Sequence, residues 1–139
     1  MEETRSTGTG LGMTYIFAKT FVHDLEAMAT FYEDVFGLVR FGTHQDEMLG
    51  RKIEEVMYQA SYPGGPALTL IKYVDSTGPI AGEAVQGFMS DDLEALVERA
   101  LAHGGSVPDP IRIIPAYNIK VVFVLDPEGH IIEVIQTVS

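Results

Sequence analysis

One carboxylate stands in an apolar segment near the end of the chain, where it could move a proton. Glu133 follows Ile131 and Ile132 and precedes Val134, a pattern that suits a strand. A carboxylate among apolar neighbours can act as a general base or accept a hydrogen bond from a substrate. It can also be satisfied by hydrogen bonds within the fold and have no chemical role. The sequence leaves both interpretations of Glu133 open.

Three cationic residues could accompany this carboxylate. Lys19 shares a strand face with Phe17, because side chains alternate at a period of two. Lys19 could pair with Glu133, hold an anionic ligand, or keep its ammonium in water at the strand end. Arg112 and Lys120 are the best anion partners in the second half of the chain. In an enzyme, such cations would stabilise developing negative charge.

Other catalytic patterns are missing from the sequence. The four histidines, at positions 23, 44, 103 and 130, are scattered and form no metal-binding spacing. The chain has no cysteine, so it has neither disulfides nor a thiolate metal site. GxSxG, Walker and GxGxxG patterns are also absent. His130 alternates with Glu133, so we expect it to point to the other face, in a surface or dimer contact.

The composition restricts the class of partner. The net charge is −11, from 20 acidic and 9 basic residues, and such a field repels phosphate backbones and anionic lipids. We therefore expect neither nucleic acid nor a membrane as partner. With 139 residues and 46% hydrophobic content, the chain can form one domain with a core. Without cysteine or a signal-like apolar start, a cytoplasmic location is the simplest expectation.

The sequence contains an internal repeat. Residues 22–27 (VHDLEA) recur as residues 90–95 (SDDLEA), 68 positions later. Residues 63–65 (PGG) and 127–129 (PEG) each precede a strand-like segment, at an offset of 64. Two similar half-domains packed as a pair would place equivalent residues around one shared cavity. We therefore look for function at the positions that the repeat brings together.

The first half reads as one helix among four strands. Residues 13–22 alternate as a strand, Asp24 caps the following helix and Gly37 ends it. Three further strands are predicted, over residues 38–41, 53–62 and 67–73.

The second half follows the same order. A strand over residues 83–89 precedes a helix that begins at a capping box of Asp91 and Glu94. Residues 107–115, with three prolines, are irregular, and residues 119–125 and 131–137 are the closing strands. This β-α-β-β-β order predicts an α+β fold rather than a doubly wound sheet.

The domain plan follows from these elements. Residues 1–12 read as a flexible leader, and residues 13–137 as a single domain. Its halves are residues 13–73 and 83–137, with residues 74–82 as the linker.

The motifs resemble the vicinal oxygen chelate superfamily of glyoxalases, bleomycin resistance proteins and extradiol dioxygenases. They are residues 24–26 (DLE) with 31–38 (FYEDVFGL), residues 91–95 (DDLEA) through Gly104-Gly105, and residues 126–134 (DPEGHIIEV). Together they cover about residues 13–136. The resemblance implies two βαβββ repeats that form a cup of curved mixed sheets with outer helices. It also implies a homodimer.

The resemblance also assigns positions to the site. In metal-using members, the ligands come from the first and last strands of each half, which here are Phe17, Thr69, Val85 and Glu133. Only Glu133 is a good ligand, and a divalent ion needs several anionic or imidazole donors. We therefore expect no cofactor, and a divalent metal only if other ligands join Glu133. Gly87, on the face of Val85, leaves room for a ligand.

Three functions remain open. The first is a glyoxalase-like lyase or isomerase that acts without metal on a small carbonyl or carboxylate compound, with Glu133 as general base. The second is a bleomycin-resistance-type protein that sequesters a cationic or aromatic compound without chemistry. The third is a metal-dependent lyase or dioxygenase with ligands such as His44, Asp46 or Glu54. The residues expected to bind a ligand are Phe17, Lys19, Thr69, Val85, Gly87, Arg112, Tyr117 and Lys120.

Overall fold

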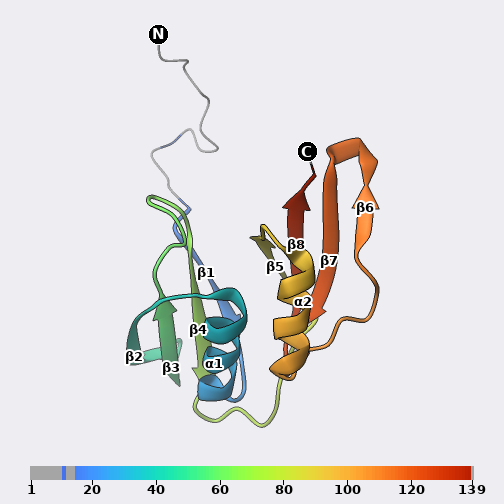
Figure 1. Ribbon diagram of the computed structural model, residues 1–139. Helices are drawn as coiled ribbons and strands as arrows, with labels where there is room; N and C mark the ends of the chain where they lie inside the picture. The colour runs from blue at the N-terminus through green and yellow to red at the C-terminus, as the bar shows by residue number, and fades with distance from the viewer. Residues whose placement is uncertain (1–10, 12–14, 139) are drawn as a thin grey trace.

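The computed structural model describes residue 11 and residues 15–138, so the leader predicted over residues 1–12 lies outside the described residues apart from Leu11. Figure 1 shows two halves, each a sheet with one helix in front of it. The first half contains β1 (Phe17–Phe21), α1 (Leu25–Phe36), β2 (Arg40–Met48), β3 (Arg51–Tyr58) and β4 (Ala67–Tyr73). The second contains β5 (Val85–Met89), α2 (Leu93–Ala102), β6 (Arg112–Ile114), the short 3-10 helix η1 (Pro115–Tyr117), β7 (Ile119–Leu125) and β8 (Ile131–Thr137). The predicted pair of βαβββ repeats is confirmed.

The two sheets have the same topology. Their strand orders are β1-β4-β3-β2 and β5-β8-β7-β6. In each sheet the first strand pairs in parallel with the last, and the remaining pairs are antiparallel. The register sets Lys19 beside Thr69 in the first sheet and Gly87 beside Glu133 in the second. Both β1 and β5 are edge strands, so the residues of the candidate site lie near the edges of their sheets.

The helix ends follow their capping residues. The Asp24 carboxylate caps α1, and Gly37 ends it in the left-handed conformation at a φ of 71°, which glycine adopts without steric cost. The cap of α2 is Asp92, whose carboxylate accepts a hydrogen bond from the backbone N–H of Ala95 at 3.0 Å. The predicted capping box at Asp91 is therefore wrong by one residue. Asp91 and Asp92 are adjacent and have the same side chain, so the sequence alone did not show which of them caps the helix.

The strand from residue 40 is longer than expected. The sequence suggested a strand over residues 38–41, whereas β2 extends to Met48. It pairs with β3 through a tight turn at Leu49 and Gly50, both of which have positive φ angles. Most of β2 is exposed and polar, so the strand is formed by its backbone ladder rather than by an alternating apolar pattern.

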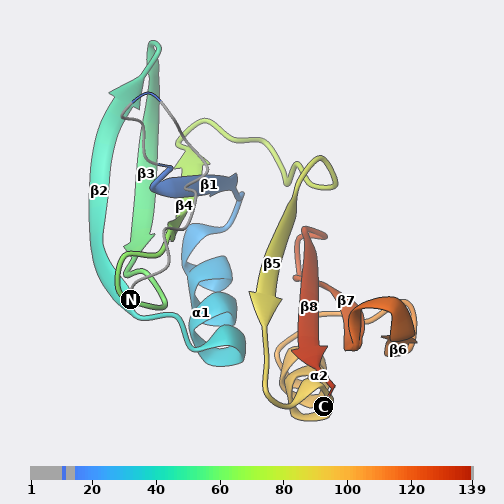
Figure 2. The same cartoon turned by 90° about the horizontal axis from the view of Figure 1, so that it is seen from above.

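The two helices pack together in a core that both halves share. In Figure 2, α1 lies between the first sheet and β5. Phe36 of α1 stacks on Phe88 of β5, with ring centroids 4.3 Å apart. Arg99 of α2 donates its Nε–H to the carbonyl oxygen of Val35, at 3.1 Å. Alternate residues of β3, β4, β7 and β8 complete this core; they include Val56, Leu70, Val122, Val124, Ile132 and Val134.

The opposite faces of the two sheets turn away from the shared core, and we call them the cup faces. Phe17 and Val85, which the repeat makes equivalent, lie on the two cup faces and are 46% and 53% exposed. Neither residue lines any of the larger cavities among residues 15–138. Within this part of one chain, Phe17 and Val85 therefore do not line one of these cavities together, whereas Ala18 and Gln86, which are also 68 positions apart, both line the cavity of about 830 Å³.

A buried polar network joins the halves on the helix side. His130 is only 7% exposed. Its Nδ1 lies 2.9 Å from Oδ2 of Asp126, and its Nε2 lies 2.7 Å from the carbonyl oxygen of Phe21. The hydroxyl of Tyr32 also donates to Asp126, at 2.9 Å. The expected surface or dimer contact of His130 is therefore wrong, because the face opposite Glu133 is the one that packs into the core.

Neither α1 nor α2 is both long and apolar enough to cross a bilayer; this finding covers the described residues.

Candidate functional site

Glu133 lies in the middle of the second cup face. The register places it on β8 between Gly87 of β5 and Phe123 of β7. Its half-buried carboxylate makes no side-chain hydrogen bond or ion pair with residues 15–138. A Cβ atom added to Gly87 would meet nothing within 4 Å, so open space adjoins Glu133. This carboxylate is free to accept a hydrogen bond or a proton from a ligand.

The first cup face carries an ion pair that the sequence did not reveal. Lys19 forms a salt bridge with Glu55 of β3, and its Nζ lies 5.4 Å from the centre of the Phe17 ring. The Glu55 side chain is 4% exposed and that of Lys19 is 31% exposed. Lys19 therefore pairs with Glu55 instead of Glu133, and its remaining N–H groups are available at the cup face.

Glu55 could have been found from the strand period. Val56 belongs to the core, and successive side chains of a strand point to opposite faces. Lys19 pairs with Thr69, and Thr69 pairs with Met57. Glu55 is two residues from Met57 on the same strand, so it shares the cup face with Lys19. The sequence analysis assigned residues 53–62 to a strand without assigning its faces, and so missed this residue.

The four family metal positions do not form a suitable donor set. Phe17 and Val85 have no donor atoms, and buried Thr69 offers one neutral hydroxyl. Glu133 is the only anionic ligand among them. A divalent ion requires several anionic or imidazole ligands to replace its hydration shell, so these residues do not fit a metal.

The alternative ligands do not converge either. His44 and Asp46 share the cup face of β2, with His44 Nε2 3.1 Å from Oδ2 of Asp46. Glu54 lies on the opposite face of β3, because its neighbour Glu55 faces the cup. Within residues 15–138 and residue 11, no three His, Asp or Glu side chains lie together in a way that could hold a metal ion.

The predicted residues of the second half separate into two groups. Arg112 is exposed on β6 and pairs with Val121, which shares the face of Glu133. Lys120 lies on the helix side instead, with its Nζ 3.3 Å from the Glu94 carboxylate of α2. Of these two cations, only Arg112 shares a sheet face with Glu133.

The predicted ligand-binding residues therefore occupy several places. Tyr117 is exposed in η1, apart from the centre of either sheet. The first cup face holds Phe17, Lys19 and Thr69, and the second holds Val85, Gly87, Arg112 and Glu133.

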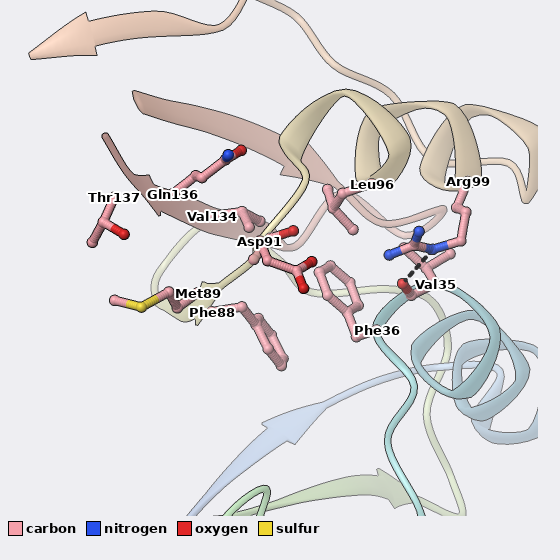
Figure 3. A pocket seen from close by; sticks show the side chains of 11 residues that line it. Val35, Phe36, Phe88, Met89, Asp91, Leu96, Arg99, Val134, Gln136 and Thr137 are labelled. Atoms are coloured by element: carbon pink, nitrogen blue, oxygen red, sulfur yellow. Dashed lines mark hydrogen bonds between the residues drawn. The ribbon is translucent and has the colours of Figure 1, made fainter. Parts of the chain in front are cut away.

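Two cavities lie between the halves. One, of about 830 Å³, lies beside the edges of β1 and β5 and is lined in part by Tyr15, Tyr62 and Gly87. The other, of about 670 Å³, lies on the helix side and is lined in part by Asp91 and Arg99 (Figure 3). Because Gly87 neighbours Glu133, the first cavity adjoins the candidate site, whereas none of the predicted site residues lines the second.

The fold is α+β and consists of two βαβββ units in tandem. Each unit is a mixed sheet with a helix on one face, and space large enough for a ligand lies along the edge strands. Residues 14–134 match the model of the Glyoxalase/Bleomycin resistance protein/Dioxygenase superfamily. The chain belongs to this family. A comparison with curated proteins finds no match.

Solved structures support the same fold. A glyoxalase family protein from Bacillus cereus is 17% identical, with a TM-score of 0.74, over 98% of this chain and 100% of that one. A glyoxalase I mutant from Zea mays is 21% identical, with a TM-score of 0.67, over 87% of this chain and 45% of that one. A fosfomycin resistance protein from Listeria monocytogenes, complexed with Mn(II) and sulfate, is 15% identical, with a TM-score of 0.61, over 92% and 93% of the two chains. At these identities the likeness extends to the fold alone.

Proposed function

We propose that this protein acts on a small organic molecule held at the cup faces, as a glyoxalase-like lyase or isomerase that works without the usual divalent metal. The observation that carries the proposal is the Glu133 carboxylate, which has no partner among residues 15–138 and adjoins the open space at Gly87. A carboxylate in this position is suited to remove a proton next to a carbonyl group.

Lys19 would stabilise the negative charge that such a proton transfer creates. The Glu55 carboxylate and the Phe17 ring hold its ammonium at the cup face, and a positioned cation lowers the energy of a developing oxyanion. Lys19 and Glu133 are on different sheets, whose cup faces diverge within one chain. Both groups would meet one substrate only where a cup is closed.

A homodimer would close the cup. The cup faces and the adjoining strand ends expose large apolar side chains, among them Phe17, Val85 and Met89. Apolar groups gathered on a surface favour a partner that removes them from water. A second copy would bring the first cup face of one chain against the second cup face of the other. Such a dimer would carry two equivalent sites, and we expect it in the cytoplasm.

A second candidate is a bleomycin-resistance-type protein that sequesters its ligand without chemistry. The cavity of about 830 Å³ favours it, because exposed Tyr15 and Tyr62 line a space that would suit a flat aromatic compound. The net charge of −11 would attract a cationic one. In this case Glu133 would be dispensable for binding.

A ligand screen separates the two candidates. Small carbonyl, carboxylate and cationic aromatic compounds would be screened by thermal shift, and each hit incubated with enzyme and followed by NMR for product. The proposed enzyme forms product, and Glu133→Gln abolishes it while binding persists. Glu98→Gln, at an exposed position of α2, is the matched control and should change neither. Tight binding without product, unchanged in Glu133→Gln, would favour the sequestering protein, and no hit at all in any class would count against both.

A further inference from the structure

The ring of His130 lies between two groups that can only accept hydrogen bonds. Its Nε2 is 2.7 Å from the backbone carbonyl oxygen of Phe21, at the end of β1. Its Nδ1 is 2.9 and 3.0 Å from the two carboxylate oxygens of Asp126. A carbonyl and an ionised carboxylate have no proton to donate, so both ring nitrogens must donate. A neutral imidazole has one N–H only.

We infer that His130 is an imidazolium and that its Nε2 proton forms a pH-sensitive latch between the two halves of the chain. The latch fastens the end of β1, in the first half, to residues 126–130 of the second half. This role goes beyond the proposed function, since it concerns no ligand and does not involve Glu133.

The Asp126 carboxylate is built to remain ionised. It is 3% exposed and accepts from the Tyr32 hydroxyl at 2.9 Å and from the backbone N–H groups of Glu128 and His130 at 2.9 and 3.0 Å. Burial by itself would raise the pKa of Asp126, but the hydrogen bond and charge of His130 lower it below the usual range. The buried imidazolium therefore faces an ionised carboxylate at neutral pH.

The same contacts act on the histidine. Burial by itself would lower the pKa of His130, but the hydrogen bond and charge of Asp126, with the Phe21 carbonyl and the Glu128 charge, raise it above its ordinary value. The hydrogen-bond geometry requires a charged ring, and the raised pKa acts in the same direction. The latch should therefore be closed at neutral pH and open only under more alkaline conditions.

The other titratable groups around the His130 ring have hydrogen-bond or ion-pair partners of their own, or favour its charged form. Glu128 accepts from the backbone N–H groups of His23 and Asp24, at 2.8 and 2.7 Å. Lys19 and Glu83 line the same cavity of about 170 Å³ as His130, and Lys19 is paired with Glu55. The titratable groups near His130 in its own turn, the β1–α1 region and the linker include Asp126, Glu128, Tyr32, His23, Asp24, Lys19 and Glu83. Acids outnumber bases among them, which favours the charged ring.

Loss of the proton would open one contact in particular. The neutral tautomer that keeps Nδ1–H retains the bond to Asp126, so Nε2 is the nitrogen that loses its proton. Its lone pair would then face the Phe21 carbonyl oxygen at 2.7 Å, where two acceptors repel each other. The end of β1 would separate from the second half. Strand β1 also carries Phe17 and Lys19. A change in pH at His130 would therefore alter the position of these two residues of the first cup face.

The direction of the pH effect follows from the raised pKa. A group whose pKa is higher in the folded state contributes stability that is fully present below its unfolded pKa, roughly 6.5 for histidine. The contribution is lost as the pH rises through the folded pKa of His130. The latch therefore weakens on the alkaline side.

Side-chain ¹⁵N NMR of the full chain between pH 5 and 9.5 tests the protonation state. We expect both nitrogens of His130 to carry protons at pH 7.5. A neutral His130 ring at pH 7.5 would overturn the inference.

Amide hydrogen exchange of the same sample tests the latch. Protection factors of the His23 and Asp24 amides, which bridge to Glu128, should fall about tenfold or more as His130 deprotonates. The Met28 amide, bonded within α1 to the Asp24 carbonyl at 3.0 Å, should keep its protection. Equal loss at all three amides, or none at any, would contradict a latch.

A variant pair isolates the charge. His130→Gln cannot titrate, so its His23 and Asp24 protection should not change with pH beyond the intrinsic rate. His103→Gln, on the exposed end of α2, should keep the wild-type profile. If His130→Gln does not fold, the NMR titration and the hydrogen exchange of the wild type decide the question. Loss of the pH-dependent change in protection in His103→Gln would reject the latch.

Discussion

Lys19 and Glu55 form an ion pair across the cup face of the first sheet, from β1 to β3, with the glutamate buried and the lysine partly exposed. The pair spans the intervening strand β4. Glu55 has no other side-chain partner among residues 15–138. The lysine thus both neutralises a buried carboxylate and presents its ammonium to the cup.

This arrangement predicts unequal effects of removing the two partners. Lys19→Met leaves a buried carboxylate without a counter-ion and should lower the free energy of unfolding by about 2–4 kcal/mol. Glu55→Gln should cost less, about 1 kcal/mol, because the lysine head can turn to water. Urea unfolding at pH 7 measures both. Lys72→Met, in β4 of the same sheet and without an ion pair in the described range, is the control, and a larger loss in Glu55→Gln than in Lys19→Met would contradict the account.

Acid should weaken the fold through Asp126. Its pKa is lowered, because the His130 contacts outweigh the effect of burial, so its contribution is present above about pH 4 and is lost as the pH falls through its folded pKa. Asp126→Asn should therefore be less stable than the wild type by about 3–5 kcal/mol at pH 6. Urea unfolding from pH 6 to pH 2 should show this difference shrinking. A difference that stays constant over this range would mean that the Asp126 charge does not stabilise the fold.

A close backbone approach requires glycine at position 105. A Cβ atom there would lie 2.9 Å from the carbonyl oxygen of Leu125 and 3.1 Å from that of Ala100. Gly105→Ala should destabilise the chain by about 1–3 kcal/mol, since these backbone atoms cannot move aside cheaply. Gly78→Ala is the matched control, because its Cβ would meet nothing within 4 Å. Thermal unfolding compares the two, and equal stability of both variants would contradict the packing.

The start of α2 distinguishes two adjacent aspartates. Asp92→Ala removes the hydrogen bond to the backbone of Ala95 and should cost about 1 kcal/mol. Asp91→Ala removes no such bond and should stay within about 0.5 kcal/mol of the wild type. Chemical unfolding of both variants measures the difference. The reverse order would restore the capping box expected at Asp91.

The sequence was most informative where a local pattern and a capping residue agree. Residues 131–137 are rich in β-branched residues and form β8 within the expected bounds, and Asp24 and Gly37 bound α1 as expected. β2 was underestimated because its exposed polar residues carry no apolar period, and its strand conformation comes from pairing with β3. Backbone pairing between distant segments is not visible in a local window.

The site was less predictable because it depends on how the sheets face each other. The repeat correctly related Phe17 to Val85. The sequence did not show that the packing of α1 against β5 leaves the two sheet faces that carry them pointing in different directions. The partner of Lys19 was missed, since Glu55 lies 36 positions away on a strand whose faces had not been assigned. His130 was expected at the surface, because the sequence does not reveal that the helices of both halves share one core.

Metal content tests the central claim most directly, namely that the candidate site around Glu133 works without the family's divalent ion. Protein purified without chelator would be analysed for metals, then heated with added nickel, zinc, manganese or iron(II). The account predicts far less than one ion per chain and no rise in melting temperature with metal concentration, because Phe17, Thr69 and Val85 supply no strong ligand. One ion per chain, with a melting temperature that rises with metal as linkage requires and no longer does so in Glu133→Gln, would contradict it.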